Sequence, residues 1–118
     1  MSIRKVANST LLKISSIYLG LLEAITEREK GDEGKSNEKI NSLNQLLQRE
    51  NFTYHDLKSI SIEYSVDPQQ WITEMKRFVK RSISGDTSSL NEDKEYILST
   101  TLYIRRLLSS KEVFKKAF

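Results

Sequence analysis

Three small groups of residues have types and spacings that could support chemistry. Residues 31–36 read Gly-Asp-Glu-Gly-Lys-Ser, and Gly-Lys-Ser before a helix is the end of a phosphate-binding loop, in which backbone amides and an ammonium group hold phosphate oxygens. That loop also requires a glycine where this sequence has Glu29, and it follows a buried strand, whereas the preceding residues here have helical periodicity. We therefore interpret residues 30–35 as a charged loop.

The single histidine and the closely spaced carboxylates offer little more. His55 is near Asp56 and Glu63 in the sequence, but without a second histidine or any cysteine these groups bind a metal only weakly. We expect His55 to be an exposed residue in the first turn of a helix. Glu23 and Glu27 fit one helix face, yet glycoside hydrolysis needs carboxylates across a cleft and di-iron sites need Glu-x-x-His partners. The sequence predicts no catalytic residue, no cofactor and no metal site, and therefore no enzyme.

The composition limits the fold to a few classes. The chain has 118 residues, of which 37% are hydrophobic and 30% charged, with four glycines, one proline and no cysteine. That length favours a single domain, 1–118, and so few turn residues are atypical of sandwiches, barrels and doubly wound sheets. Uncharged runs such as residues 14–22 are much shorter than the roughly 20 residues that span a bilayer. We expect a cytoplasmic protein without a transmembrane segment.

Hydrophobic side chains recur at three- and four-residue spacing along the whole chain, as in amphipathic helices. The expected helices are Val6–Arg28, a second from a cap at Ser36 or Asn37 to about Glu50, Thr53–Ser65, Asp67–Ser82, one from Ser89 to Leu108 and a short terminal helix from Ser109.

Two of these helix starts carry several capping signals each. Thr53 with Asp56 three residues later resembles a capping box, and Phe52 with Leu57 occupies the two positions of a hydrophobic staple. In the next helix Asp67 is the expected cap, Pro68 the first helical residue and Gln70 the third. Val66 and Trp71 form its staple, so Trp71 is expected to be buried, and Gly85 supplies the turn at its other end.

The last main helix is expected to have one apolar face. The residues assigned to that face are Ile97, Thr101, Ile104 and Leu108, with Leu98 and Leu102 beside them. Short connections favour antiparallel packing of consecutive helices. The prediction is an all-α fold, an antiparallel four-helix bundle, or five helices if Thr53–Tyr64 packs as its own short element.

Charge is shared unevenly between the two halves of the chain. Residues 1–67 have nine basic and ten acidic side chains, a net charge of −1, and residues 68–118 have ten basic and six acidic ones, a net charge of +4. A basic carboxy-terminal surface suits phosphate, anionic headgroups or an acidic protein; the alternative is a solvated face with some salt bridges. The candidate partner-binding residues are Lys76, Arg77, Lys80, Arg81, Arg105, Arg106, Lys111, Phe114, Lys115 and Phe118.

A helix-turn-helix is the second interpretation of the same region. With Val66 at the apolar turn position, Ile60, Tyr64 and Trp71 occupy core positions. The helix from Pro68 to Ser82 would then present side chains suited to base edges, namely Gln69, Gln70 and Thr73. Two residues depart from the motif: Ser65 stands at the usual glycine of the turn, and Glu74 at a position that is normally apolar.

The carboxy-terminal part of the sequence resembles a known family. Residues 75–86 (MKRFVKRSISGD), 89–92 (SLNE) and 98–106 (LSTTLYIRR) are similar to the last two helices of the immunity proteins of pediocin-like bacteriocins. The long first helix and the charged loop at 30–35 depart from that family. The resemblance implies a small, basic, cytoplasmic antiparallel four-helix bundle. It also implies a protein that protects a producing cell by recognising the bacteriocin on its sugar-permease receptor, with specificity in the carboxy-terminal half, including Phe114 and Phe118.

The sequence thus favours a non-enzymatic interaction protein with a protein or peptide partner, and the resemblance implies that this partner is at the inner membrane surface. A small DNA-binding regulator is the alternative.

Overall fold

The computed structural model describes residues 2–86, 88 and 90–117, and the side chains of these residues as far as Ser109. The described part of the chain contains five helices and no strand. The helices are α1 (Ile3–Glu29), α2 (Glu33–Arg49), α3 (Tyr54–Tyr64), α4 (Gln69–Ser84) and α5 (Leu90–Ala117). The all-α prediction is confirmed, and residues 54–64 form a separate helix.

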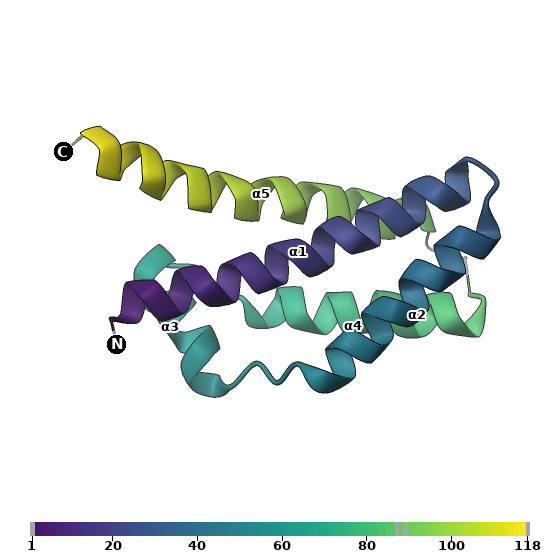
Figure 1. Cartoon of the computed structure of the whole chain (residues 1–118), viewed down its shortest axis with the longest axis horizontal. Coiled ribbons are helices and arrows are strands. Elements are labelled where there is room, and N and C mark those ends of the chain that lie inside the picture. Colours follow the sequence, from purple (N-terminus) through teal and green to yellow (C-terminus); the bar gives the residue numbers. More distant parts are fainter. Residues whose placement is uncertain (1, 87, 89, 118) are drawn as a thin grey trace.

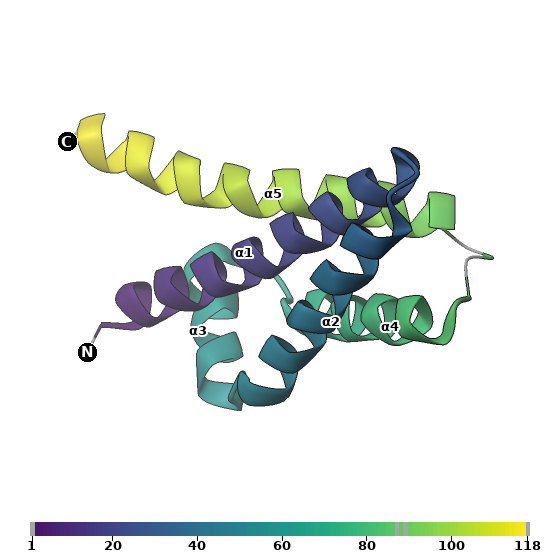
Figure 2. The same ribbon diagram turned by 45° about the vertical axis from the view of Figure 1, so that its right-hand side comes forward.

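Helix α1 is the central element of the bundle. It packs against α2, α3 and α5, whereas α4 packs mainly against α2. Figure 1 shows α1 and α4 running in one direction while α2 and α5 return in the other. The short helix α3 lies across this direction, as the turned view in Figure 2 also shows. The four long helices therefore form an antiparallel bundle, and the short helix α3 packs across α1.

The first helix is longer than its hydrophobic pattern predicts. It begins at Ile3 because the hydroxyl of Ser2 accepts a hydrogen bond from the backbone N–H of Lys5 and so caps the helix. Its buried side chains recur at three- and four-residue spacing along the helix, because α1 is covered by three neighbours. They are Ala7, Thr10, Leu11, Ile14, Ser15, Ile17, Tyr18, Leu21, Ala24 and Ile25.

The expected cap of the second helix at Ser36 or Asn37 is wrong. Asp32 caps α2 instead, because its carboxylate accepts a hydrogen bond from the Lys35 N–H at 3.0 Å. Ser36 lies one turn inside the helix, is buried, and donates its hydroxyl hydrogen to the Ala24 carbonyl at 2.8 Å. A serine at a plausible capping position thus makes a contact between α1 and α2.

The start of α3 and the end of α4 follow the predicted capping chemistry, whereas the start of α4 departs from it. Thr53 and Asp56 form both hydrogen bonds of the capping box. The expected cap of α4 at Asp67 is wrong, because the helix begins at Gln69 and Pro68 occupies the cap position. The Asp67 carboxylate still accepts a hydrogen bond from the Gln69 N–H at 3.1 Å. Trp71 is 8% exposed, as expected. Gly85 ends α4 with a φ of 81°, a left-handed conformation that glycine adopts without strain.

The predicted break after Leu108 is wrong, because α5 continues to Ala117 with no glycine or proline to interrupt it. Ile97, Thr101 and Ile104 are buried as predicted. Leu98 and Leu102, expected beside this face, are 40% and 54% exposed. At about 100° per residue, Leu98 lies at the flank of the buried face and Leu102 lies further towards the outer side of the helix. The expected cap Ser89 lies outside the described residues.

A buried tyrosine links α1 to the start of α4. The hydroxyl of Tyr18 donates a hydrogen bond to the Trp71 carbonyl at 2.7 Å, across 53 residues of sequence. Burial raises the pKa of Tyr18 well above its usual range, and Tyr96 of α5 and Glu74 raise it further. Tyr18 therefore stays protonated and can keep donating at any pH at which the fold persists.

Tyr18→Phe is expected to lower the free energy of unfolding by about 1 kcal/mol, because the ring still fills the core while the Trp71 carbonyl loses its donor. The melting temperature should fall by about 4–6 °C. Urea denaturation measures the first quantity and calorimetry the second. Tyr54→Phe is the matched control, since Tyr54 is 78% exposed. Equal stabilities of the two variants would contradict a structural role for the Tyr18 hydroxyl.

Candidate functional site

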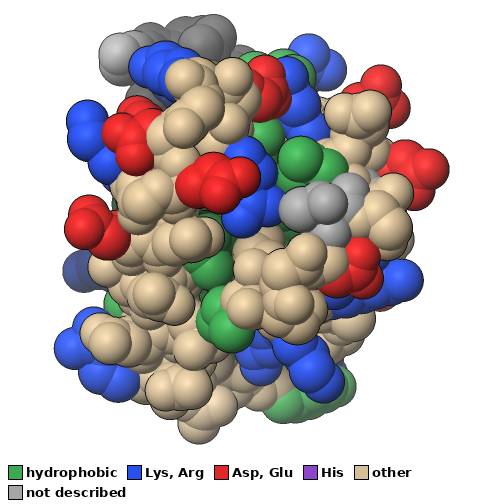
Figure 3. Space-filling model, turned by 90° about the vertical axis from the view of Figure 1, so that its right-hand side faces the viewer, with side chains coloured by type: hydrophobic (Ala, Val, Ile, Leu, Met, Phe, Trp, Pro, Cys, Tyr) green, Lys and Arg blue, Asp and Glu red, His purple; other side chains and the backbone are tan. Residues whose placement is uncertain are grey.

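Acidic and basic side chains are not evenly mixed on the end of the molecule drawn in Figure 3. The acidic side chains visible there lie in the upper and middle parts, and the lowest part carries Lys and Arg beside hydrophobic side chains. That lowest part is at the level of α4 and the later part of α2 in Figure 1. The surface around α4 is therefore a candidate binding site.

Helix α4 has a sharply two-sided distribution of side chains. Its buried face consists of Trp71, Ile72, Met75, Phe78 and Val79. Lys76, Arg77 and Lys80 are exposed on the rest of its surface. Arg77 is within 3.4 Å of the Glu74 carboxylate, whereas Lys76 and Lys80 have no hydrogen bond and no ion pair with any described residue. Two of the predicted basic residues therefore present unneutralised ammonium groups.

Arg81 differs from its predicted place on the outer side of the helix. Its guanidinium lies 2.5 Å from the carboxylate of Asp93 in α5, and the two side chains are only 23% and 16% exposed. Because the pair is largely shielded from water, it holds α4 and α5 together next to the turn that joins them. We therefore assign Arg81 to the fold and remove it from the exposed basic surface.

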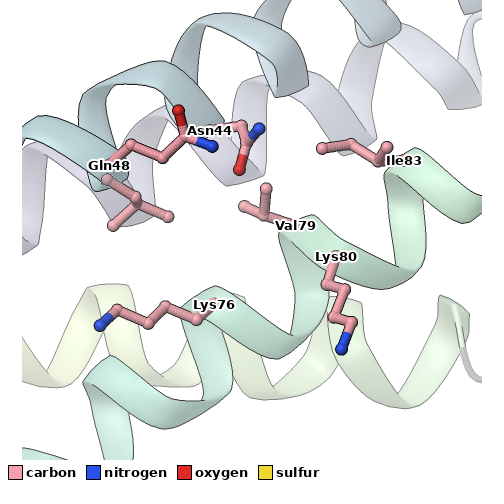
Figure 4. Close-up of a pocket in the computed structure, with 7 residues that line it drawn as sticks. Asn44, Gln48, Lys76, Val79, Lys80 and Ile83 are labelled. Carbon is pink, nitrogen blue, oxygen red and sulfur yellow. The ribbon is translucent and has the colours of Figure 1, made fainter.

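A groove of about 390 Å³ lies between α2 and α4. Figure 4 shows Asn44 and Gln48 on the α2 side, with Lys76, Val79, Lys80 and Ile83 on α4. Leu47 and Val79 are buried at its floor, and Ile83 is 50% exposed. Ile83 also lines a second groove of about 440 Å³ towards the start of α2, so this side chain is common to both grooves.

The α2 wall of this groove is a row of side-chain amides. Asn37 and Asn41 line the stretch near the start of α2, and Asn44 and Gln48 line the stretch further along. Their spacing of four, three and four residues places them on one helix face. None of the four amides makes a hydrogen bond within the described part of the chain. The spacing was visible in the sequence, but polar residues beside an apolar stripe are also what a solvated face contains.

Of the other predicted partner-binding residues whose side chains are described, Arg105 and Arg106 do not line this groove. Arg105 and Arg106 are exposed on α5, whose Tyr103 packs edge-on against Trp71 with the ring centroids 6.1 Å apart. Lys111, Phe114 and Lys115 belong to the described backbone of α5, but their side chains, and all of Phe118, lie outside the described residues. Of the predicted residues whose side chains are described, the structure gathers only Lys76 and Lys80 at one groove.

The connection between α3 and α4 has some features of a helix-turn-helix. Ser65 adopts the left-handed conformation that the motif usually gives to glycine, with φ 56° and ψ 44°. Gln69, Gln70 and Thr73 are exposed. However, α3 packs against α1 while α4 packs against α2. The two helices are therefore each held by a different neighbour, whereas in the motif they support each other.

The ionisable side chains that the sequence offers for catalysis or metal binding are separated from one another or already paired. His55 is exposed in the first turn of α3, as predicted. Glu23 accepts a hydrogen bond from Lys39 at 2.6 Å, and this contact raises the pKa of Lys39. Hydrogen bonds from the Ser88 hydroxyl and N–H lower the pKa of Asp86. Among the described residues, no three His, Asp or Glu side chains are grouped to hold a metal ion.

The same part of the chain contains no helix with the length and apolar character needed to cross a membrane. Comparisons with protein-family models, curated proteins and solved structures give no significant match.

The pair between Arg81 and Asp93 can be tested by a double-mutant cycle. Arg81→Met and Asp93→Asn are each expected to lower the free energy of unfolding by about 1–2 kcal/mol, because each removes a contact between opposite charges that is largely shielded from water. The double variant should lose less than the sum of the two, as measured by urea denaturation. Arg77→Met, which removes an exposed pair on the same helix, should change stability by less than about 0.5 kcal/mol. Additive effects would show that the pair contributes nothing.

Proposed function

We propose that this chain is a non-enzymatic interaction protein, and in its most concrete form an immunity-like protein that recognises a bacteriocin peptide together with its receptor. The observation that carries the first part is the groove between α2 and α4, whose amide and lysine side chains have no partner among the described residues. Polar groups arranged around exposed apolar surface are what a protein-binding site offers. The resemblance of residues 75–106 to the immunity proteins supports the second part, as does the all-α bundle.

The basic groups of α4 agree with a partner that carries negative charge. Lys76 and Lys80 are exposed on α4, and attraction between opposite charges speeds association and orients the partner. A partner at the inner membrane surface would be accessible to a cytoplasmic protein of this kind. Membrane attachment is not needed for such a role, because the partner supplies the location.

Expression of the chain in a bacterium sensitive to pediocin-like bacteriocins tests the immunity function. We expect survival at bacteriocin concentrations that kill the parent strain, and loss of that protection when Lys76 and Lys80 are both replaced by glutamate. The measurement is the inhibitory concentration for a panel of purified bacteriocins, with equal protein levels checked by blotting. Unchanged sensitivity across the panel would contradict immunity while leaving a different protein partner open.

Removal of residues 110–118 tests the role of the carboxy terminus. We expect the truncated chain to lose partner recognition while its melting temperature falls by less than about 8 °C, because α5 is anchored by Ile97 and Ile104 before the truncation. Calorimetry and the survival assay give the two readouts. A larger drop in melting temperature would show that the tail belongs to the core.

DNA binding remains the second candidate because Ser65 has the turn conformation of a helix-turn-helix and the glutamines at the start of α4 are exposed. A DNA-binding protein that neutralises several phosphates loses affinity steeply as salt rises. Gel-shift titrations against genomic fragments distinguish the two functions. A regulator is expected to bind at low salt and to dissociate as salt increases. Absence of binding at low salt would eliminate it.

A further inference from the structure

The two walls of the groove between α2 and α4 specify the kind of partner that fits it. We propose that this groove binds an amphipathic α-helix of a partner protein, with an apolar face on the groove floor and acidic side chains along the flank that faces α4. This inference rests on the proposed function as an interaction protein and names the chemistry of the partner. It does not depend on whether that partner belongs to a bacteriocin system.

The floor of the groove calls for apolar side chains. Leu47 and Val79 form the buried base of one stretch, and Ile40 lies at the base of the other. Ile83 stands between the two stretches and is half exposed. Covering apolar surface of this kind contributes about 25 cal/mol per Å² removed from water. A partner that placed an apolar side chain against Ile83 would therefore gain affinity without any rearrangement of the bundle.

The row of amides favours a helix over an extended peptide. Asn37 and Gln48 are eleven residues apart on α2, which corresponds to about 16 Å along the helix. The four amides are therefore spaced by about 5.5 Å on average, close to the 5.4 Å pitch of an α-helix. Side chains on one face of a strand repeat every 6.6–6.8 Å or so. A partner helix lying along the groove can place one side chain per turn next to each amide. The side chains of a partner strand are spaced more widely than the amides, so they would no longer face them after about three contacts.

The backbones of the two helices that form the groove also favour a helical partner over an extended peptide. Both walls are helices, whose interior N–H and C=O groups are hydrogen-bonded within each helix and so offer no edge for an added strand. An extended peptide would leave most of its own backbone groups to water or to the few amides. A helical partner satisfies its backbone internally and uses only side chains at the contact.

The positive charge on the α4 wall favours a partner with negative charge. Lys76 and Lys80 are four residues apart, and no acidic residue is among the side chains that line this stretch of the groove. Both ammonium groups extend from α4 in Figure 4 without a contact to α2. Acidic side chains one turn apart on the partner helix would reach both lysines. The stretch towards the start of α2 contains Arg28 and Glu33 together, so the requirement for acidic residues applies at the Lys76 end.

A displayed library of helical peptides tests the proposal. Peptides of about 14 residues, long enough for three turns plus their ends, carry fixed leucines on one face and random residues elsewhere. They are selected on the full-length protein and counter-selected on Ile83→Glu, whose folding is checked by circular dichroism. We expect enriched peptides to carry Asp or Glu on one flank. The most enriched peptide is then synthesised with a fluorescent label, and its dissociation constant is measured by anisotropy.

Three variants then locate the binding site. Replacing Lys76 and Lys80 together by glutamine should weaken binding of the labelled peptide about tenfold, since each lost charge contact costs on the order of half a tenfold step or more. Ile83→Glu should abolish it. Arg77→Gln is the matched control, because it removes one positive charge from the same helix outside the groove, and its effect should stay within about twofold.

Several results would overturn the proposal. Enriched peptides that are basic or non-helical would do so, as would binding that is indifferent to the groove variants or selection that yields no peptide. Binding of a DNA duplex or of phosphatidylserine vesicles through Lys76 and Lys80, with no peptide selected, would assign the lysines to phosphate instead. Peptide binding elsewhere on the protein would overturn the groove while supporting an interaction function, and the survival assay tests the immunity function separately.

Discussion

The burial of one broad face of α1 under three helices is the constraint on which the other elements depend. Three helices pack against it. Its buried polar groups therefore need hydrogen-bond partners, and the side chains of the neighbouring helices need space to pack closely. Tyr18 meets the first need by donating to the Trp71 carbonyl. Gly20 meets the second, because a Cβ at that position would lie 2.9 Å from the side chain of Leu43. Because α2, α3 and α5 cover this face of α1, α4 packs mainly against α2. One side of the contact between α2 and α4 stays open as the groove.

Periodicity and capping chemistry were sufficient to predict most of the fold. Local signals with few competing uses were interpreted correctly, as for the Thr53–Asp56 capping box and the glycine that ends α4. The errors arose where one residue type has two uses. Ser36 has the right chemistry for a cap but serves a tertiary hydrogen bond, and Ser109 was interpreted as a helix start although a serine is also tolerated inside a helix. Sequence alone does not distinguish these uses, because the choice depends on the neighbouring helix.

The candidate site was predicted only in part, for a similar reason. Net charge located the basic residues on α4 correctly, but it could not separate Arg81, which is neutralised by Asp93 from another helix, from Lys76 and Lys80, which are not. Nor could it show that the amide face of α2 and the lysine face of α4 would be brought to the same groove. A site formed by two helices is a property of their packing, and a hydrophobic pattern fixes which face is buried but not which partner buries it.

The position of α5 has a consequence for the order in which the chain becomes folded. Helices α1 and α2 are joined by a short turn, Lys30–Asp32, so their contact closes a small loop and forms at little entropic cost. The side of α1 that receives α5 is completed by residues far along the chain, through contacts such as that between Glu29 and Lys94. During synthesis this side of α1 therefore stays uncovered until α5 has left the ribosome. Docking of α5 is accordingly the step that closes the core, and a chain stopped before it would expose an aggregation-prone surface.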